Sequence, residues 1–159
     1  MLQNGLGQTS LEVSQMGLGL AQIGELQMDA APSVSRLLNV ALDEGINFFD
    51  TAACYKISEE LLGKSIAHRR HEFVLASKCG HSDNPNSSDW NATTITTNIE
   101  RSLKRLRTDH LDLLQLHSCG VDVLERGEAI ETLETAKKAG KVRFIGYSGD
   151  NEAAQWALH

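Results

Sequence analysis

Residues 41–52 read ALDEGINFFDTA, and residues 136–148 read AKKAGKVRFIGYS. Both stretches pass from the end of a helical pattern through a glycine into a short apolar strand that ends on small or polar residues. Near-continuous apolar runs are typical of parallel strands covered on both faces, and their alternation with helices predicts βαβ units. We therefore expect an α/β fold with a parallel sheet. Its strands are predicted at Met16–Leu20, Ile46–Asp50, Phe73–Lys78, Leu111–His117 and Val142–Ser148.

The stretches between these runs have the spacing of amphipathic helices. In the first, Ser33 is the expected N-cap and Gly45 the expected stop. Ser58, Glu59 and Glu60 are expected to open a second helix, with acidic residues at its positive end. The apolar stripe of the first helix consists of Val34, Leu37, Leu38, Ala41 and Leu42. Further stripes predict helices over residues 95–106 and 130–136.

The spacing of the units indicates a larger architecture. The units from Met16 to Val142 average about 31 residues each, and eight of them would make the roughly 250 residues of a (β/α)8 barrel. The prediction is a TIM-barrel type fold truncated to about four and a half βα units. An N-terminal β-hairpin is expected over residues 1–15 and the βα units over residues 16–159.

A doubly wound open sheet of five strands is the alternative at this length. That fold expects a glycine-rich phosphate loop after the first strand. Residues 17–27, GLGLAQIGELQ, match such a loop only in part, so the alternative has weak support.

The composition excludes several classes of protein. The 159 residues are 41% hydrophobic and 23% charged with a formal net charge of −6, which argues against disorder and against general nucleic-acid binding. No apolar run approaches the ~20 residues of a membrane helix, and the N-terminus lacks a signal-peptide profile, so we expect a cytoplasmic protein without membrane contact. Cys54, Cys79 and Cys119 are odd in number and lack CxxC spacing, so we expect no disulfide framework and no metal site.

Polar residues stand where a barrel carries its chemistry, at the carboxyl ends of strands. Asp50, Lys78 and His117 end three successive predicted strands, and Tyr55 lies on the loop after Asp50. A buried core favours apolar groups at such positions, because an unpaired buried charge costs several kcal/mol. The set therefore indicates a reactive site, and its chemistry is that of proton donation to a carbonyl oxygen.

Each of the four residues has a role in that chemistry. A free tyrosine is a weak acid, and the ammonium of Lys78 beside Tyr55 would stabilise the phenolate and make the phenol a better proton donor. Asp50 would hold Lys78 charged and oriented, and His117 would hydrogen-bond the substrate oxygen. The set contains no evident nucleophile, so a hydride cofactor is the economical source of electrons.

The long polar loop from Cys79 to Ala92 would lie at the same end of the sheet. Loops there usually shape substrate specificity, so Trp90 is a candidate wall of the substrate pocket; the alternative is a surface loop with a packing tryptophan. The three cysteines would stand near this rim. A redox-sensitive or metal-trapping rim is one interpretation, and small, partly buried filler residues are the one we favour.

Longer segments resemble one known family. The chain is similar to the N-terminal half of the aldo-keto reductases over essentially all of its length. Gly7–Thr9 and Leu11–Ser14 resemble the family's N-terminal hairpin. The segments around the family's catalytic residues and fifth strand are matched by GINFFDTA (45–52), Tyr55 with SEELLGKSI (58–66), LASK (75–78), SLKRLRTDHLDLLQLH (102–117) and GKVRFIGYS (140–148).

The resemblance implies a barrel that reduces an aldehyde or ketone to an alcohol with NADPH, which becomes NADP⁺. Hydride would pass to the carbonyl carbon while Tyr55 delivers the proton as general acid. Tyr55 and His117, with Trp90 from the loop argument, would contact this small carbonyl substrate. The residues corresponding to the family's catalytic positions are Asp50, Tyr55, Lys78 and His117, and those implied at the cofactor are Gly19, Leu20, Asp50 and Ser148.

Departures from the family pattern bear on the cofactor half of the site. Lys56 stands where a glycine often follows the tyrosine, Leu20 where a threonine is common, and Gly149 where an asparagine often follows the serine. Strands six to eight of the barrel are not in the chain. In the family they supply the residue that stacks on the nicotinamide and the basic loop that binds the pyrophosphate and 2′-phosphate.

The alternative to an active reductase is a catalytically inactive truncated barrel that acts, if at all, as an interaction module. Its first and fifth strands would each lack a barrel neighbour, and unpaired strand edges favour association. A homo-oligomer formed through these edges is therefore the second hypothesis.

Overall fold

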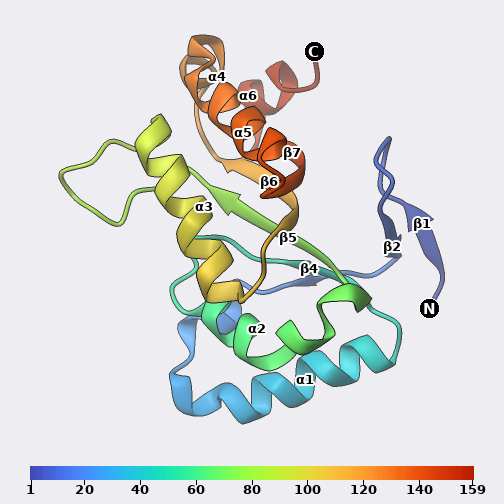
Figure 1. Ribbon diagram of the computed structural model, residues 1–159. Helices are drawn as coiled ribbons and strands as arrows, with labels where there is room; N and C mark the ends of the chain where they lie inside the picture. The colour runs from blue at the N-terminus through green and yellow to red at the C-terminus, as the bar shows by residue number, and fades with distance from the viewer.

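The computed structural model describes all residues from 1 to 159, and its centre is a parallel sheet of five strands (Figure 1). The order is β3-β4-β5-β6-β7, so each strand pairs with the next one along the chain. A barrel has this sequential order, whereas a doubly wound sheet reverses its order at a switch point. The predicted barrel type is thus confirmed over the doubly wound alternative. The strands are β3 (Leu18–Gly19), β4 (Phe48–Asp50), β5 (Val74–Cys79), β6 (Leu111–His117) and β7 (Val142–Ser148).

The helices form one layer on a single face of this sheet (Figure 1). Along that layer α1 packs against α2, α2 against α3, and α3 against α5, which is the arrangement of the outer ring of a barrel. The α-helices are α1 (Ala31–Asp43), α2 (Ser58–Ile66), α3 (Ala92–Leu106), α4 (Val121–Arg126), α5 (Glu128–Lys138) and α6 (Asn151–Trp156). Three short 3-10 helices are η1 (Gln22–Glu25), η2 (Met28–Ala30) and η3 (Ala67–Glu72).

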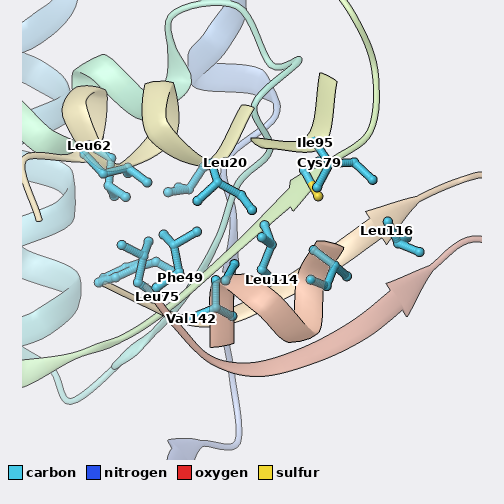
Figure 2. Close-up of a cluster of buried hydrophobic side chains, with 14 of the residues drawn as sticks. Leu20, Phe49, Leu62, Leu75, Cys79, Ile95, Leu114, Leu116 and Val142 are labelled. Atoms are coloured by element: carbon cyan, nitrogen blue, oxygen red, sulfur yellow. The ribbon is translucent and has the colours of Figure 1, made fainter. Parts of the chain in front are cut away.

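The hydrophobic core lies between the sheet and this helical layer. Phe49, Leu75 and Leu114 come from adjacent strands, are at most 1% exposed, and meet side chains from the helices such as Leu62 and Ile95 (Figure 2). Because side chains alternate along a strand, the residues next to these in sequence point to the opposite, concave face. That inner face carries Phe48, Leu113 and Phe144 in a half-buried state.

An antiparallel hairpin of β1 (Gln3–Gly5) and β2 (Glu12–Ser14) packs against the beginning of the sheet. Asn47 joins the two parts. Its side-chain Oδ1 accepts a hydrogen bond from the backbone N–H of Ser14 at 2.7 Å, and its backbone N–H donates to Ser14 Oγ at 3.0 Å. Leu11 and Val13 of the hairpin bury themselves with Val74 at the same place. The hairpin therefore covers the end of the inner face opposite to the predicted site.

A buried ion-pair cluster also lies near the beginning of the strands. The Asp112 side chain is 3% exposed, and its carboxylate accepts from Arg70 and from Arg143 at 2.7 Å each. It also accepts from the Leu75 amide at 2.9 Å. Burial alone would raise the pKa of Asp112, but the Leu75 amide and the two guanidinium groups outweigh it and hold that pKa below its usual range.

Two local predictions about α1 are wrong. The helix begins at Ala31 instead of after Ser33, because a 3-10 turn leads into it and Pro32 occupies its first turn, where a missing N–H costs nothing. Leu37 is 53% exposed, because it lies at the edge of the arc formed by the other four residues of the predicted stripe, which are buried as expected: Val34, Leu38, Ala41 and Leu42. The stop at Gly45 is confirmed, since α1 ends at Asp43 and Gly45 follows with φ +85°.

No helix of this chain is at once long enough and apolar enough to span a lipid bilayer.

Candidate active site

Four predicted site residues lie together at the carboxyl ends of the strands. Asp50 ends β4, Lys78 is the penultimate residue of β5, His117 ends β6 and Ser148 ends β7. Lys78 pairs in register with Gln115, and His117 with Ser148, so all of these side chains share the inner face of the sheet. Sheet register alone therefore brings residues almost 100 positions apart in sequence into one site.

Lys78 is the most deeply buried charged group of this set. Its Nζ lies 2.5 Å from Oδ2 of Asp50, and it donates a second hydrogen bond to the Thr51 carbonyl at 2.9 Å. The Lys78 side chain is 7% exposed and that of Asp50 is 32% exposed. A buried ammonium is tolerated only when it is paired and hydrogen-bonded, so Asp50 and the Thr51 carbonyl fix both its charge and its place.

Tyr55 lies on the loop between β4 and α2, with its ring beside this ammonium. Nζ of Lys78 is 5.1 Å from the centroid of the Tyr55 ring. Hydrogen bonds from the Tyr55 amide to the Ala52 carbonyl, and from the Ser58 amide to the Tyr55 carbonyl, hold the loop in a tight turn. Gly24 of η1 packs against it so closely that a Cβ there would meet the Tyr55 carbonyl oxygen at 2.3 Å. The backbone of the loop that carries the Tyr55 phenol is therefore held in place by these contacts.

His117 completes the group at the end of β6. Its ring stands edge-on to that of Tyr55, with 5.8 Å between centroids and an interplanar angle of 81°. Burial lowers the pKa of His117, and the positive charges of His81 and Lys78 lower it further against the opposing effect of Asp50. The imidazole is therefore neutral at pH 7 and has one donor and one acceptor nitrogen.

Trp90 lies next to the backbone of His117. Its indole Nε1 donates to the His117 carbonyl at 3.0 Å, and its ring is 5.2 Å from that of His81. The Trp90 amide donates to the Gly80 carbonyl, and a Cβ on Gly80, which has φ +125°, would meet the indole at 2.3 Å. Trp90 thus anchors the loop after β5 to the end of β6, next to the ring of His81.

A cavity of about 490 Å³ opens on the inner face of the sheet. Its wall includes three of the predicted cofactor residues, Gly19, Asp50 and Ser148, together with Lys78. A Cβ added to Gly19 would meet nothing within 4 Å, so the backbone of β3 faces open space there. The remainder of the wall consists of Gly17, Gln115 and the apolar side chains of Leu6, Leu18, Phe48 and Leu113.

The fourth predicted cofactor residue, Leu20, lies elsewhere. Its side chain is 3% exposed and belongs to the hydrophobic core under the helices (Figure 2). Its amide donates to the Asp50 carbonyl at 2.8 Å, and its carbonyl accepts from Ser58 Oγ at 2.8 Å. Leu20 therefore presents no free polar group to the cavity, and its neighbour Gly19 is the residue that lines it.

The family model described as the Aldo/keto reductase family matches residues 15–158. The chain belongs to the aldo-keto reductase family. An uncharacterised oxidoreductase of Bacillus subtilis is 34% identical over an alignment of 154 positions that covers 93% of this chain and 49% of that protein. L-Galactose dehydrogenase of Arabidopsis thaliana is 34% identical over 156 residues, covering 91% of this chain and 47% of that enzyme.

Solved structures agree with this assignment. A Pseudomonas aeruginosa protein described as an aldo-keto reductase superposes with a TM-score of 0.87 at 39% identity, covering 99% of this chain and 63% of the other. The predicted family and the TIM-barrel type of its fold are thus confirmed. The chain spans about half the length of the curated relatives it matches.

Within this aldo-keto reductase chain, sequence reasoning missed a buried carboxyl next to the site. Glu59 is fully buried, and its Oε1 accepts from Oγ of Ser77, the neighbour of Lys78, at 2.8 Å. Nη1 of Arg105 lies 3.7 Å from the other oxygen of Glu59 and donates to the Ala53 carbonyl on the Tyr55 loop at 3.2 Å. Burial raises the pKa of Glu59 despite these partners.

The signal for Glu59 was present in the sequence but pointed two ways. An acidic residue in the first turn of a helix is normally exposed and stabilised by the helix dipole. Glu59 also stands three and seven positions before Leu62 and Ile66, on the face that α2 buries. Helical spacing, read alone, would have placed it inside.

The cysteines are all free. Cys79 and Cys119 are buried, and burial raises the pKa of Cys79 to about 12. Burial likewise raises the pKa of Cys119. Both therefore stay protonated near neutral pH, which agrees with filler residues and not with reactive thiolates. Cys54 is half-buried and contacts His117.

Proposed function

We propose that this protein transfers hydride from NADPH to an aldehyde or ketone and that Tyr55 donates the proton that completes the alcohol. Membership of the aldo-keto reductase family supports an oxidoreductase role. The single observation that carries the proposal is the buried ammonium of Lys78, fixed by Asp50 on one side and lying beside the ring of Tyr55 on the other.

The acid–base step follows from this arrangement. As the carbonyl oxygen gains charge, Tyr55 releases its proton to it, and the nearby ammonium of Lys78 stabilises the phenolate that remains. Asp50 and the Thr51 carbonyl keep Lys78 from moving during the step. Neutral His117 donates a hydrogen bond to the substrate oxygen and fixes where it lies relative to Tyr55.

The cavity on the inner face fits the nicotinamide end of the cofactor. Gly19 leaves open space against the backbone, and the hydroxyl of Ser148 makes no hydrogen bond within the chain, so it is available to a ligand amide. When bound, NADPH supplies the hydride. Asp50 and Lys78 both line this cavity, and Lys78 also lies beside the ring of Tyr55, so the ion pair connects the cofactor wall with the proton donor.

A fluorescence titration with NADPH tests the cofactor site. We expect saturable binding near micromolar Kd, about 8 kcal/mol, weakened in Ser148→Ala and in Gly19→Val, which fills the open space. Ser35→Ala on the outer helix α1 is the matched control and is expected to bind as the wild type does. Identical binding by Ser148→Ala, Gly19→Val and the wild type would refute this site.

The proposed proton donor is tested by removing its hydroxyl. Tyr55→Phe is expected to lower the rate of NADPH-dependent carbonyl reduction by about 10²-fold or more while the protein stays folded. Tyr147→Phe is the matched control: it removes the other phenol of the chain, which donates to the Cys119 carbonyl on the outer side of the sheet. Full activity in Tyr55→Phe would show that the acid is another group.

We also propose that two copies associate through the open edges of the sheet. β3 pairs only with β4 and β7 only with β6, so each has one unpaired edge, and the inner face carries the half-buried apolar side chains of Phe48, Leu113 and Phe144. Light scattering coupled to gel filtration tests this, with a dimer expected and a clean monomer contradicting it.

We propose a cytoplasmic location as well. The three free thiols support placing the protein in the reducing cytoplasm.

A further inference from the structure

A sulfur–nitrogen contact joins the loop before Tyr55 to the end of β6. Sγ of Cys54 lies 3.4 Å from Nδ1 of His117. The other contacts of the imidazole are edge-on, to the ring of Tyr55 at 5.8 Å and to that of His81 at 5.2 Å between centroids. Nε2 has no hydrogen-bond partner within the chain, so it is the ring atom left for a ligand.

Both members of this contact are neutral near pH 7. Burial lowers the pKa of His117 below 6.5, aided by the charges of His81 and Lys78 and opposed by Asp50. Burial also raises the pKa of the Cys54 thiol above 9.0, against the smaller effects of its own backbone amide and of Lys78. A protonated thiol and a neutral imidazole therefore face each other.

The partner of Nδ1 decides which nitrogen of a neutral imidazole carries the proton. Nδ1 of His117 is the one hydrogen-bond partner that the structure gives the Cys54 thiol. When the S–H donates to Nδ1, the ring proton must lie on Nε2. In the reverse arrangement Nδ1–H would rely on sulfur, a weak acceptor, and the thiol proton would be left unpaired.

We propose that Cys54 is a positioning residue whose S–H donates to Nδ1 of His117 and holds the ring in the tautomer that presents an Nε2–H. A carbonyl oxygen can only accept hydrogen bonds, so this tautomer is the one that binds it and stabilises the charge it gains. The role toward substrate rests on the proposed function. The hydrogen bond and the tautomer are properties of the chain alone.

The direct test is the tautomer of His117, read from long-range ¹H–¹⁵N correlations at pH 8 in protein labelled with ¹⁵N-histidine. His117→Gln identifies this ring among the six histidines. We expect Nε2 to carry the proton and Nδ1 to show the shift of an unprotonated nitrogen that accepts a hydrogen bond. A proton on Nδ1 in the wild-type protein would overturn the proposal.

Three cysteine variants separate the hydrogen bond from packing. Cys54→Ala removes the donor, and the Nδ1 signal is expected to move toward that of a free ring in tautomeric exchange. Cys54→Ser restores a donor and with it the wild-type pattern. Cys119→Ala removes a thiol two residues after His117 and is expected to leave the ring signals unchanged. An Nδ1 signal that is the same in Cys54→Ala and wild type would refute the hydrogen bond.

Kinetics test the role toward substrate separately. Cys54→Ala is expected to raise KM for the carbonyl about fivefold, as for the loss of one oriented hydrogen bond, with NADPH affinity unchanged. Cys54→Ser is expected to recover most of it. An unchanged KM in Cys54→Ala would overturn the positioning role. A wild-type chain that shows the Nε2–H tautomer but reduces no carbonyl would refute the proposed function and leave the hydrogen bond standing.

Discussion

Nζ of Lys78 lies 2.5 Å from Oδ2 of Asp50, at the ends of neighbouring parallel strands. Asp50→Asn keeps the size of the side chain and an oxygen acceptor, but it removes the negative charge that pairs with the ammonium, whose other partner is the neutral Thr51 carbonyl. We expect activity to fall by about tenfold or more and the free energy of unfolding by about 1–3 kcal/mol. NADPH oxidation and urea unfolding measure the two effects. Asp29→Asn, an exposed aspartate in no ion pair, is the control, and equal behaviour of the two variants would contradict the role given to Asp50.

The ion-pair cluster at the beginning of the strands makes a prediction about stability alone. Asp112→Asn leaves the charges of Arg70 and Arg143 without their shared carboxylate, and breaking a buried pair costs about 3–5 kcal/mol. Urea unfolding at pH 7 measures this cost. The exposed neighbour Asp109→Asn is expected to change the free energy by about 0.5 kcal/mol or less. A small effect at Asp112 would show that the cluster does not hold the sheet together.

The lowered pKa of Asp112 also sets the lowest pH at which this residue stabilises the fold. Its folded pKa lies below the unfolded value near 3.8, so its contribution is fully present above about pH 3.8 and is lost as pH falls through the folded pKa. The stability difference between the wild type and Asp112→Asn should therefore shrink below that pH. A difference that stays constant down to the acid transition would contradict the assigned shift.

Glu59 has the opposite pH dependence. Its folded pKa is raised above the unfolded value near 4.5, so its contribution is greatest below that pH and is lost as pH rises through the folded pKa. Glu59→Gln retains an oxygen for Ser77 and removes the buried charge. We expect its stability relative to wild type to increase from pH 4 to pH 7, as measured by urea unfolding. Glu60→Gln, on the same turn but 40% exposed, should show no such trend.

The neutral state of His117 depends on the charges around it. Burial is the main cause of the lowered pKa of His117, and the charges of His81 and Lys78 lower it further. His81→Gln is therefore expected to raise the midpoint of the His117 titration toward 6.5. Proton NMR of the ring measures this midpoint. A protonated ring carries a proton on Nδ1 and can no longer accept from the Cys54 thiol that positions it, so kcat/KM should fall on the acid side with the same midpoint. An unshifted titration in His81→Gln would show that the contact carries no electrostatic coupling.

Sequence reasoning located the long elements well because their signal is local. β6 and β7 have the bounds that their apolar runs predict, whereas β4 begins two residues late because Asn47 is used to hold the hairpin. Periodicity and strand register were enough to bring Asp50, Lys78 and His117 together, because parallel strands end at the same edge.

Contacts that depend on loop geometry were out of reach of the sequence. The hydrogen bond between Cys54 and His117 joins residues 63 positions apart, and no spacing rule places the sulfur of a loop residue next to an imidazole at the end of a strand. Leu20 is a second position at which the sequence pattern was insufficient. Its place in the family pattern suggested the cofactor, but the alternation of side chains at the end of β3 directs it into the core.

The most direct test of the account is the fate of the hydride. The wild-type chain is incubated with an aldehyde and NADPH that carries deuterium at both C4 positions of the nicotinamide, and the alcohol is analysed by mass spectrometry. The account predicts one deuterium on the carbinol carbon, formed at a rate that falls by about 10²-fold or more in Tyr55→Phe. An alcohol without deuterium, or no alcohol from a folded chain that binds NADPH, would contradict it.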